Sequence, residues 1–266
     1  MTTSTTHIVQ FKDRNVTKKD FASLPLNTVR VSGLFYTVQG EGPLAGVPAV
    51  FVRLAGCNRG NKLDCPWCDT NFLMDEGKTL TITQVVNKVE KARVALSKDE
   101  PTVVITGGEP LLQPGLEPLV AELHAQGYIV QIETNGDLLR LESVPRAIVV
   151  VSPKVSMRTK EYKMLPVGAL GRADYLKFLV EDKPDSPYRD IPGYAYEFAD
   201  RLGSQKVFIS PISEYQRDIR PKEVASMWSD LFDKEVASRN HAYAARFVMQ
   251  QGLRMSIQSH LFMSLE

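Results

Sequence analysis

Short apolar segments alternate with segments of helical periodicity along most of this 266-residue chain. Predicted strands cover residues 47–54, 102–106, 128–134, 147–151, 175–180 and 206–209. Predicted helices cover residues 81–96, 116–126 and 214–246, and residues 181–205 are predicted to form a loop with a short helix. Strands that alternate with helices imply parallel β/α units, so we expect a single α/β domain.

Polar or glycine-rich motifs follow three of these predicted strands directly. They are Gly-Gly-Glu at residues 107–109, Asn-Gly at 135–136 and Ser-Pro-Lys at 152–154. In β/α folds, binding and catalytic sites are built at the carboxyl ends of the strands. The sequence therefore predicts a site at one edge of the sheet, although Gly-Gly-Glu-Pro and Asn-Gly also suit plain turns.

The three cysteines of the chain, Cys57, Cys65 and Cys68, all lie within twelve positions. An odd and clustered set argues against a disulfide framework. Thiolates two residues apart can converge on one metal or cluster, and a third can join from a loop. Three thiolates leave one iron of a [4Fe–4S] cluster open to a small molecule. A structural zinc site would need a fourth ligand, and all four histidines are remote in sequence, so zinc is the weaker alternative.

The charge balance points away from nucleic acids and membranes. The chain has 32 basic and 31 acidic residues, which gives a net charge of +1. No apolar run approaches the ~20 residues that span a bilayer, and the polar N-terminus lacks the apolar core of a secretory signal. We therefore expect a cytoplasmic protein in which residues 1–28 form a loosely ordered lead-in to a domain at residues 29–266.

Eight short motifs recur in a fixed order from about residue 34 to the end of the chain. They are TVQGEG (37–42), GVPAVFVRLAGC (46–57), CPWCDT (65–70), ITGGEP (105–110), QIETNG (131–136), VSPK (151–154), SPIS (210–213) and LRMSIQSH (253–260). Together they resemble the 7-carboxy-7-deazaguanine synthase family of the radical S-adenosylmethionine superfamily. Three features depart from the family's usual pattern: the seven-residue gap between Cys57 and Cys65, Ser210 in place of Gln, and Leu261 in place of Lys.

The resemblance implies an incomplete (β/α)6 barrel of the TIM type, with residues 29–266 as its catalytic domain. It also implies a [4Fe–4S] cluster on Cys57, Cys65 and Cys68, whose electron cleaves S-adenosylmethionine to a 5′-deoxyadenosyl radical. The implied cofactor contacts are Trp67, Gly108, Glu109, Ser152, Pro153, Lys154, Ser210, Pro211, Ile212 and Ser213. Thr70 is the implied ligand of Mg²⁺, although a helix N-cap is an alternative role for it.

The substrate implied by the resemblance is 6-carboxy-5,6,7,8-tetrahydropterin, which the family converts to 7-carboxy-7-deazaguanine with loss of ammonia. Arg53 supports a site independently, because a charged residue in an apolar strand is costly unless it is paired. The expected substrate contacts are Val38, Gln39, Gly40, Glu41, Arg53, Thr106, Gln258, His260 and Glu266, with residues 255–260 expected to form a strand.

Two other functions are compatible with the cysteines. An activase that installs a glycyl radical on a partner protein would share the cluster and the Gly-Gly-Glu motif. A zinc-binding interaction protein would share only the thiolates. The resemblance further implies an electron donor such as flavodoxin or ferredoxin and a homodimer.

Overall fold

The computed structural model of the chain describes residues 16–59, 65, 68, 77–93, 101–156, 158–213 and 233–263. Its main sheet is built from β1 (Thr28–Val38), β2 (Pro48–Leu54), β3 (Lys78–Thr81), β4 (Thr102–Gly107), β5 (Ile129–Thr134), β6 (Ile148–Val151), β9 (Tyr175–Val180), β10 (Val207–Pro211) and β11 (Arg254–Met255). The strand order is β11-β10-β9-β6-β5-β4-β2-β1-β3. All neighbours from β11 to β2 are parallel, whereas β1 is antiparallel to both β2 and β3. A separate hairpin pairs β7 (Val155–Ser156) with β8 (Glu161–Tyr162).

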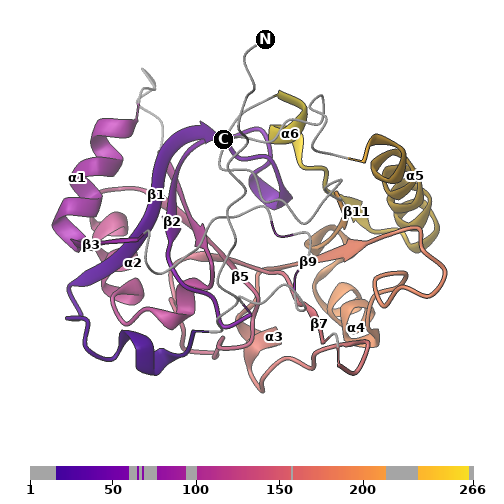
Figure 1. The fold of residues 1–266 in the computed structure, drawn as a ribbon, viewed down its shortest axis with the longest axis horizontal. Helices are drawn as coiled ribbons and strands as arrows, with labels where there is room; N and C mark the ends of the chain where they lie inside the picture. The colour runs from indigo at the N-terminus through magenta and orange to yellow at the C-terminus, as the bar shows by residue number, and fades with distance from the viewer. Residues whose placement is uncertain are drawn as a thin grey trace, which may run out of the picture.

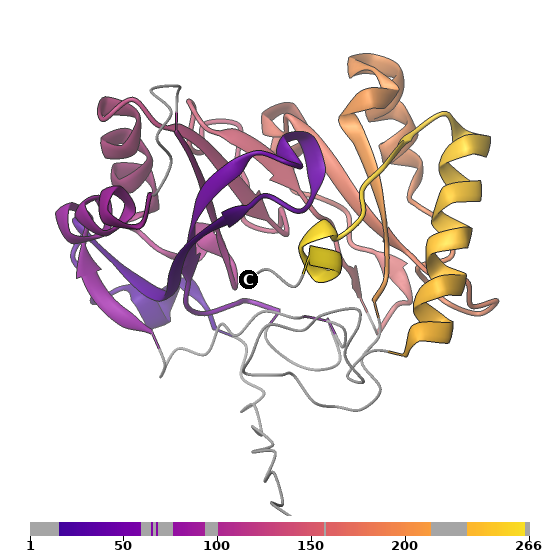
Figure 2. The same cartoon turned by 90° about the horizontal axis from the view of Figure 1, so that it is seen from above.

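Helices lie along the outside of this sheet. The α-helices are α1 (Ile82–Ala92), α2 (Leu116–Ala125), α3 (Ala169–Arg172), α4 (Gly193–Leu202), α5 (Lys234–Gln251) and α6 (Ser259–Met263). Short 3-10 helices cover Lys18–Phe21, Gly42–Leu44, Pro110–Leu112 and Ser204–Lys206. The sheet is open and curved, with α1, α2, α4 and α5 on its convex side and α6 on the concave side (Figures 1 and 2).

Local sequence signals set the ends of two of these helices. The hydroxyl of Thr81 accepts a hydrogen bond from the backbone N–H of Gln84, whose side chain accepts one from the backbone N–H of Thr81, so α1 begins with a capping box. Gly127, at φ +83°, ends α2 in the left-handed conformation that a glycine adopts without strain. The predicted start and end of these helices therefore follow from side-chain chemistry.

The two faces of the sheet differ in character, because successive strand residues point to opposite sides. Outward residues such as Val52, Ile105 and Phe178 pack with the apolar sides of the helices in one buried core. The inward positions and the strand ends carry several polar residues among apolar ones. These polar residues include Arg53, Thr106, Glu133, Ser152 and Lys177. The helices thus stabilise the sheet on one side and leave the concave side for a site.

The predicted strands agree with the structure. Strands β2, β4, β5, β6, β9 and β10 are the six parallel strands of the predicted incomplete barrel. The connection between β5 and β6, at residues 135–147, contains turns and no helix, so one of the six β/α units lacks its helix. The long strand β1 was not predicted from the sequence.

The prediction of a strand at residues 255–260 is wrong. Strand β11 ends at Met255, and Ser259 begins α6. The N–H of Ser256 still donates to the carbonyl of Ile209 in β10 at 2.8 Å, while its hydroxyl accepts a hydrogen bond from the N–H of Gly42, in the segment after β1, at 2.9 Å. The predicted helix at 214–246 is described only from Asp233, whose carboxylate caps α5; residues 214–232 lie outside the described residues.

The end of the predicted lead-in is packed rather than loose. Phe21 is fully buried and clusters with Val16 and Leu112. The N–H of Val16 donates to the carbonyl of Cys57 at 3.0 Å, so this segment reaches the first cysteine. Residues 1–15 lie outside the described residues, and the division at residue 28 stays a prediction.

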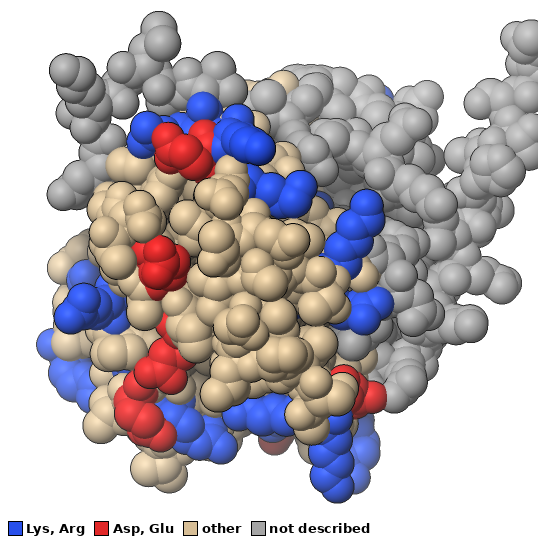
Figure 3. Space-filling view, turned by 90° about the vertical axis from the view of Figure 1, so that its left-hand side faces the viewer, with Lys and Arg blue, Asp and Glu red and all other residues tan. Residues whose placement is uncertain are grey.

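The molecular surface has no dominant charge on the side where α1 lies. Basic and acidic side chains are interspersed there around a broad uncharged area (Figure 3), in line with the net charge of +1. None of the helices in the described part of the chain combines the length and apolar character that crossing a bilayer requires.

Candidate active site

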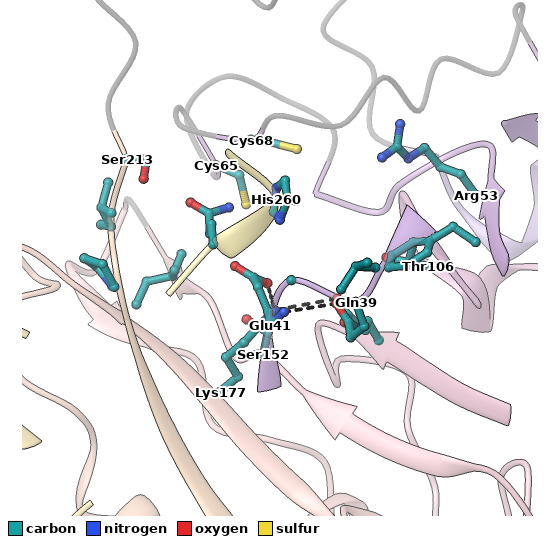
Figure 4. Close-up of a pocket in the computed structure, with 18 of the residues that line it drawn as sticks. Gln39, Glu41, Arg53, Cys65, Cys68, Thr106, Ser152, Lys177, Ser213 and His260 are labelled. Carbon is teal, nitrogen blue, oxygen red and sulfur yellow. Dashed lines mark hydrogen bonds and ion pairs between the residues drawn. The ribbon is translucent and has the colours of Figure 1, made fainter. Parts of the chain in front are cut away.

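A cavity of about 220 Å³ lies on the concave side of the sheet. Every described residue that the sequence predicted as a substrate contact lines it (Figure 4). These residues are Val38, Gln39, Gly40, Glu41, Arg53, Thr106, Gln258 and His260. The structure therefore brings together four chain segments that are far apart in the sequence. Glu266, the remaining predicted contact, lies outside the described residues.

Arg53 lies against an aromatic wall. Its guanidinium carbon is 4.9 Å from the ring centroid of Phe35, and that ring stacks on Phe51 at 5.5 Å. Its Nε atom is buried and has no hydrogen-bond partner among the described residues. A buried donor without a partner is costly. An anionic ligand in the cavity would satisfy it, and a guanidinium presents a fork that matches a carboxylate.

Lys177 is the centre of a charged group at the base of the cavity. Its ammonium pairs with Glu41, and it lies 3.6 Å from the carboxylate of Glu133. Gln39 donates from Nε2 to that carboxylate at 2.9 Å, and its own side-chain oxygen accepts from the N–H of Glu41 at 3.1 Å. Lys177 thus orients the carboxylates of Glu41 and Glu133, and Glu133 in turn orients the side-chain amide of Gln39.

Sequence reasoning did not propose Lys177, although a signal was present. The residue interrupts the apolar strand YLKFLV just as Arg53 interrupts PAVFVRL. The rule that singled out Arg53 therefore applies equally to Lys177. Glu133, which lines the same cavity, was not among the expected substrate contacts.

A second cavity, of about 160 Å³, adjoins the first. It is lined by all three cysteines and by Gly107, Gly108 and Asn135, among others. Its wall is shared with the first cavity through Cys65, Cys68, Thr106, Glu133, Ser152, Lys154 and Lys177. A group held by the cysteines would therefore border both cavities.

The cysteines suit a cluster. Burial raises the pKa of the Cys57 thiol well above its usual value, with smaller contributions from Glu109, Cys65 and Cys68. A coordinated metal would favour the thiolate and offset this cost. Among the residues described, no three His, Cys, Asp or Glu side chains are grouped closely enough for a single metal ion. The thiolates of an iron–sulfur cluster bind separate iron atoms, so they need not meet at one point.

The Gly-Gly-Glu motif packs against the segment that carries Cys57. A Cβ atom on Gly108 would lie 2.0 Å from the carbonyl oxygen of Gly56 and 3.0 Å from the Cβ of Cys57. Gly107 has φ +128° and is equally close to Leu54. Both glycines are therefore needed for backbone packing beside Cys57, whatever ligand lies in front of them.

Glu109, a predicted cofactor contact, is fully buried behind these glycines. Its carboxylate accepts hydrogen bonds from the hydroxyl of Thr134 (2.7 Å) and the N–H groups of Asn135 (2.8 Å) and Leu111 (3.0 Å). Burial raises its pKa from 4.5 to about 7, although these hydrogen bonds act in the opposite direction. In this structure Glu109 joins β4 to the end of β5, and it is not among the residues that line the two cavities. Its contact with the cofactor stays a prediction.

The other predicted cofactor contacts fall into two groups. Lys154 donates to the hydroxyl of Ser152 at 2.6 Å, and both residues line the two cavities. Burial lowers the pKa of Lys154, so a carboxylate partner would favour its charged form. Pro211, Ile212 and Ser213 line the first cavity.

The remaining residues of that set lie elsewhere. Ser210 is fully buried and donates to the carbonyl of Ser256 at 2.9 Å, so it stabilises the C-terminal segment. Pro153 is buried in the turn between Ser152 and Lys154. Trp67 and Thr70 lie outside the described residues.

The chain is similar in sequence and fold to known proteins. The family model described as the Radical SAM superfamily matches residues 52–153. The 7-carboxy-7-deazaguanine synthase of Rickettsia prowazekii is 35% identical over 243 residues, which cover 90% of this chain and 89% of that protein. The synthase of Hyperthermus butylicus is 39% identical over 208 residues, covering 73% and 82%. The crystal structure of QueE from Escherichia coli superposes with a TM-score of 0.59 at 25% identity, over 92% of this chain and 99% of that one. The chain therefore belongs to the 7-carboxy-7-deazaguanine synthase family of the radical S-adenosylmethionine superfamily.

Proposed function

We propose that this enzyme converts 6-carboxy-5,6,7,8-tetrahydropterin to 7-carboxy-7-deazaguanine with loss of ammonia. The observation that carries the proposal is the shared wall between the cysteine-lined cavity and the polar cavity. A radical generated in the cysteine-lined cavity must come within contact distance of a substrate held in the polar cavity. The polar cavity offers one fork for a carboxylate and several groups for a ring edge.

Each polar group has a specific part in this proposal. Arg53 binds the substrate carboxylate, which satisfies its buried Nε. Gln39 and Glu41 bind the pyrimidinone edge, because an amide both donates and accepts and a carboxylate accepts from two N–H groups. Lys177 keeps Glu41 oriented toward that edge.

The cofactor site in this proposal uses the cysteine-lined cavity. Bound there, a [4Fe–4S] cluster and S-adenosylmethionine would supply the radical that removes a hydrogen atom from the substrate. Cys57, Cys65 and Cys68 would hold the cluster, and Lys154 would pair with the cofactor carboxylate. The protein's own contribution is to orient both ligands and to exclude water.

Further parts of the proposal rest on the family resemblance. They are Mg²⁺ held by Thr70, reduction by a flavodoxin or ferredoxin, a homodimer and a cytoplasmic location. Removal of Mg²⁺ with EDTA, followed by its re-addition, tests the magnesium site. Turnover that is lost with EDTA and returns with Mg²⁺ supports the site, and turnover that EDTA does not change contradicts it.

The direct test is anaerobic reconstitution with iron and sulfide, followed by incubation with dithionite, S-adenosylmethionine and the carboxylated pterin. We expect 7-carboxy-7-deazaguanine by mass spectrometry and a brown protein that dithionite bleaches. Formation of 5′-deoxyadenosine without conversion of the pterin would retain the superfamily and reject the substrate. A colourless protein that holds one zinc ion would reject the radical chemistry altogether.

A matched pair of variants tests the binding mode. Arg53→Lys keeps the charge but removes the fork, so we expect KM for the pterin to rise about tenfold or more. Arg239→Lys, on the exposed side of α5, is the control and should leave KM unchanged. An unchanged KM for Arg53→Lys would remove Arg53 from the substrate site.

A further inference from the structure

A buried ion pair lies next to the first cysteine. Arg59 Nε is 2.7 Å from Asp137 Oδ2, and Arg59 Nη2 is 3.0 Å from Asp137 Oδ1. The two side chains are only 7% and 5% exposed. A pair with this little solvent needs good geometry to offset the cost of desolvation, and the two parallel hydrogen bonds provide it. Nothing in the pterin-binding proposal uses this pair.

The pair connects two loops of different origin. Arg59 belongs to the segment that follows Cys57, whereas Asp137 follows the end of β5. Asn58 strengthens the connection, since it donates to Asp137 at 3.0 Å and accepts from the side chain of Asn135 at 2.8 Å. The start of the cysteine segment is thereby fixed to the loop that also holds Glu109 through Asn135.

Arg59 also contacts the cysteine itself. Its backbone N–H donates to Cys57 Sγ at 3.4 Å, and the residue lines the cysteine-lined cavity. Hydrogen bonds to ligating sulfurs and nearby charges are among the factors that set the potential of an iron–sulfur cluster. Holding the guanidinium in place therefore holds this N–H in place as well.

We infer that Arg59 and Asp137 are positioning residues for Cys57, and that their mutual neutralisation sets the reduction potential of the cluster. The inference rests on the proposed function only in taking the three cysteines as cluster ligands. Reduction adds negative charge to the cluster, so a positive charge left beside it favours the reduced state and a negative charge disfavours it.

The pair therefore predicts shifts of opposite sign. Asp137→Asn removes one negative charge beside the cysteine segment, so the reduction potential should rise. Arg59→Gln removes one positive charge and leaves Lys163, half exposed at 3.3 Å, as the cation next to the carboxylate, so the potential should fall. The double variant has the same net charge as the wild type, so its potential should return close to the wild-type value.

The experiment is a redox titration of the reconstituted full-length protein at pH 8, followed by the electron paramagnetic resonance signal of the reduced cluster. Iron content and circular dichroism are measured on every variant. Asp182→Asn and Arg189→Gln break a more exposed Arg–Asp pair whose residues line neither cavity, and they should leave the potential unchanged. Opposite shifts of several-fold in the reduction equilibrium, cancelled in the double variant, support the inference.

Two results overturn it: wild-type potentials in all three variants with full iron content, or shifts of the same sign in both single variants. If Arg59→Gln does not retain iron, Arg59→Lys replaces it. That variant keeps the charge, so its potential should stay near the wild-type value, and a potential that falls would contradict the charge argument. Failure of the pterin proposal is distinguishable, because the wild-type protein would then show a normal titration and no product.

Discussion

Charged side chains at inward strand positions decide what the first cavity can bind. Lys177 is 9% exposed and lies between two carboxylates that are themselves 14% and 20% exposed. Without the lysine, Glu41 and Glu133 would repel each other in a poorly solvated space. Their present orientation therefore depends on a residue that need not touch the substrate.

Lys177→Met tests this dependence. Removing one partner of a buried pair costs roughly 3–5 kcal/mol, so we expect a lower free energy of unfolding in urea and a KM for the pterin raised at least tenfold. Iron content should stay at the wild-type level, because the cysteines are held from other segments. Lys206→Met, on a partly exposed lysine over the ring of Tyr175, is the control. A wild-type KM for Lys177→Met would contradict the role given to the lysine.

Glu109 gives the metal-free protein a pH-dependent stability. Its pKa is raised to about 7 in the folded state from 4.5, so the folded protein holds this proton more tightly than the unfolded chain. The resulting stabilisation is complete below about pH 4.5 and is lost as pH rises through about 7. It amounts to roughly 3 kcal/mol.

Urea unfolding of the metal-free protein between pH 5 and pH 8 measures this effect. The free energy of unfolding should fall across this range, and Glu109→Gln should remove most of the dependence. The Gln variant should also be less stable near pH 5, because its NH₂ group meets a donor where the wild type has an acceptor. Identical pH profiles for both proteins would show that Glu109 is not the titrating group.

At the residue scale, the sequence identified the contacts that have a local signal. Arg53 was found because it interrupts an apolar strand, and the cysteines because they are clustered. The cofactor contact expected of Glu109 stays a prediction; in this structure its carboxylate is held by donors from Thr134 and Asn135, at and just after the end of another strand. No local pattern in the sequence encodes that long-range contact.

Among the elements, the C-terminal segment and the turn after β1 form one unit. The carbonyl of Gly40 accepts from both the N–H and the hydroxyl of Ser259. A Cβ atom on Gly40 would lie 2.3 Å from Nδ1 of His260. The glycine is therefore required by the close approach of α6, and this approach places His260 in the cavity wall.

Gly40→Ala should displace His260 from the wall. We expect pterin turnover to fall at least tenfold while iron content and reductive cleavage of S-adenosylmethionine persist, because the cysteine-lined cavity does not include this turn. Gly193→Ala is the matched control, since a Cβ there meets nothing within 4 Å. Turnover equal to that of the control would show that the turn tolerates a side chain.

Element prediction succeeded where periodicity was the cause. Runs of apolar residues mark the six predicted parallel strands. The predicted and observed ends of these strands differ by no more than two residues. Residues 255–260 were misassigned because the hydroxyl of Ser256, and both the N–H and the hydroxyl of Ser259, bond to the turn after β1. Such a partner is set by tertiary structure and not by the local pattern.

At the scale of the whole molecule, strand β11, close to the C-terminus in sequence, forms one edge of the open sheet. Strand β11 pairs with β10, and the following residues cross to the turn after β1 near the opposite edge. The open sheet is thereby bridged over its concave side, as Figure 2 shows for α6. The alternation predicted the parallel β/α units and the family resemblance implied the incomplete barrel, but neither predicted this bridge.

Deletion of residues 256–266 tests the bridge. The shortened protein should keep its cluster and cleave S-adenosylmethionine, yet it should not convert the pterin, because Gln258 and His260 are lost from the cavity wall. Met263→Ser in the full-length chain, at an exposed position of α6, should behave as wild type. Product formation by the shortened protein would place the substrate away from this segment.

The wall common to the two cavities has a thermodynamic consequence. Ser152 and Lys154 line both cavities, so in the proposed complex each ligand would contact side chains that also face the other ligand. Free-energy linkage then requires reciprocity: S-adenosylmethionine and the pterin change each other's dissociation constant by one and the same factor. In the proposed enzyme each reactant would thus be an effector of the other, through side chains that both cavities share.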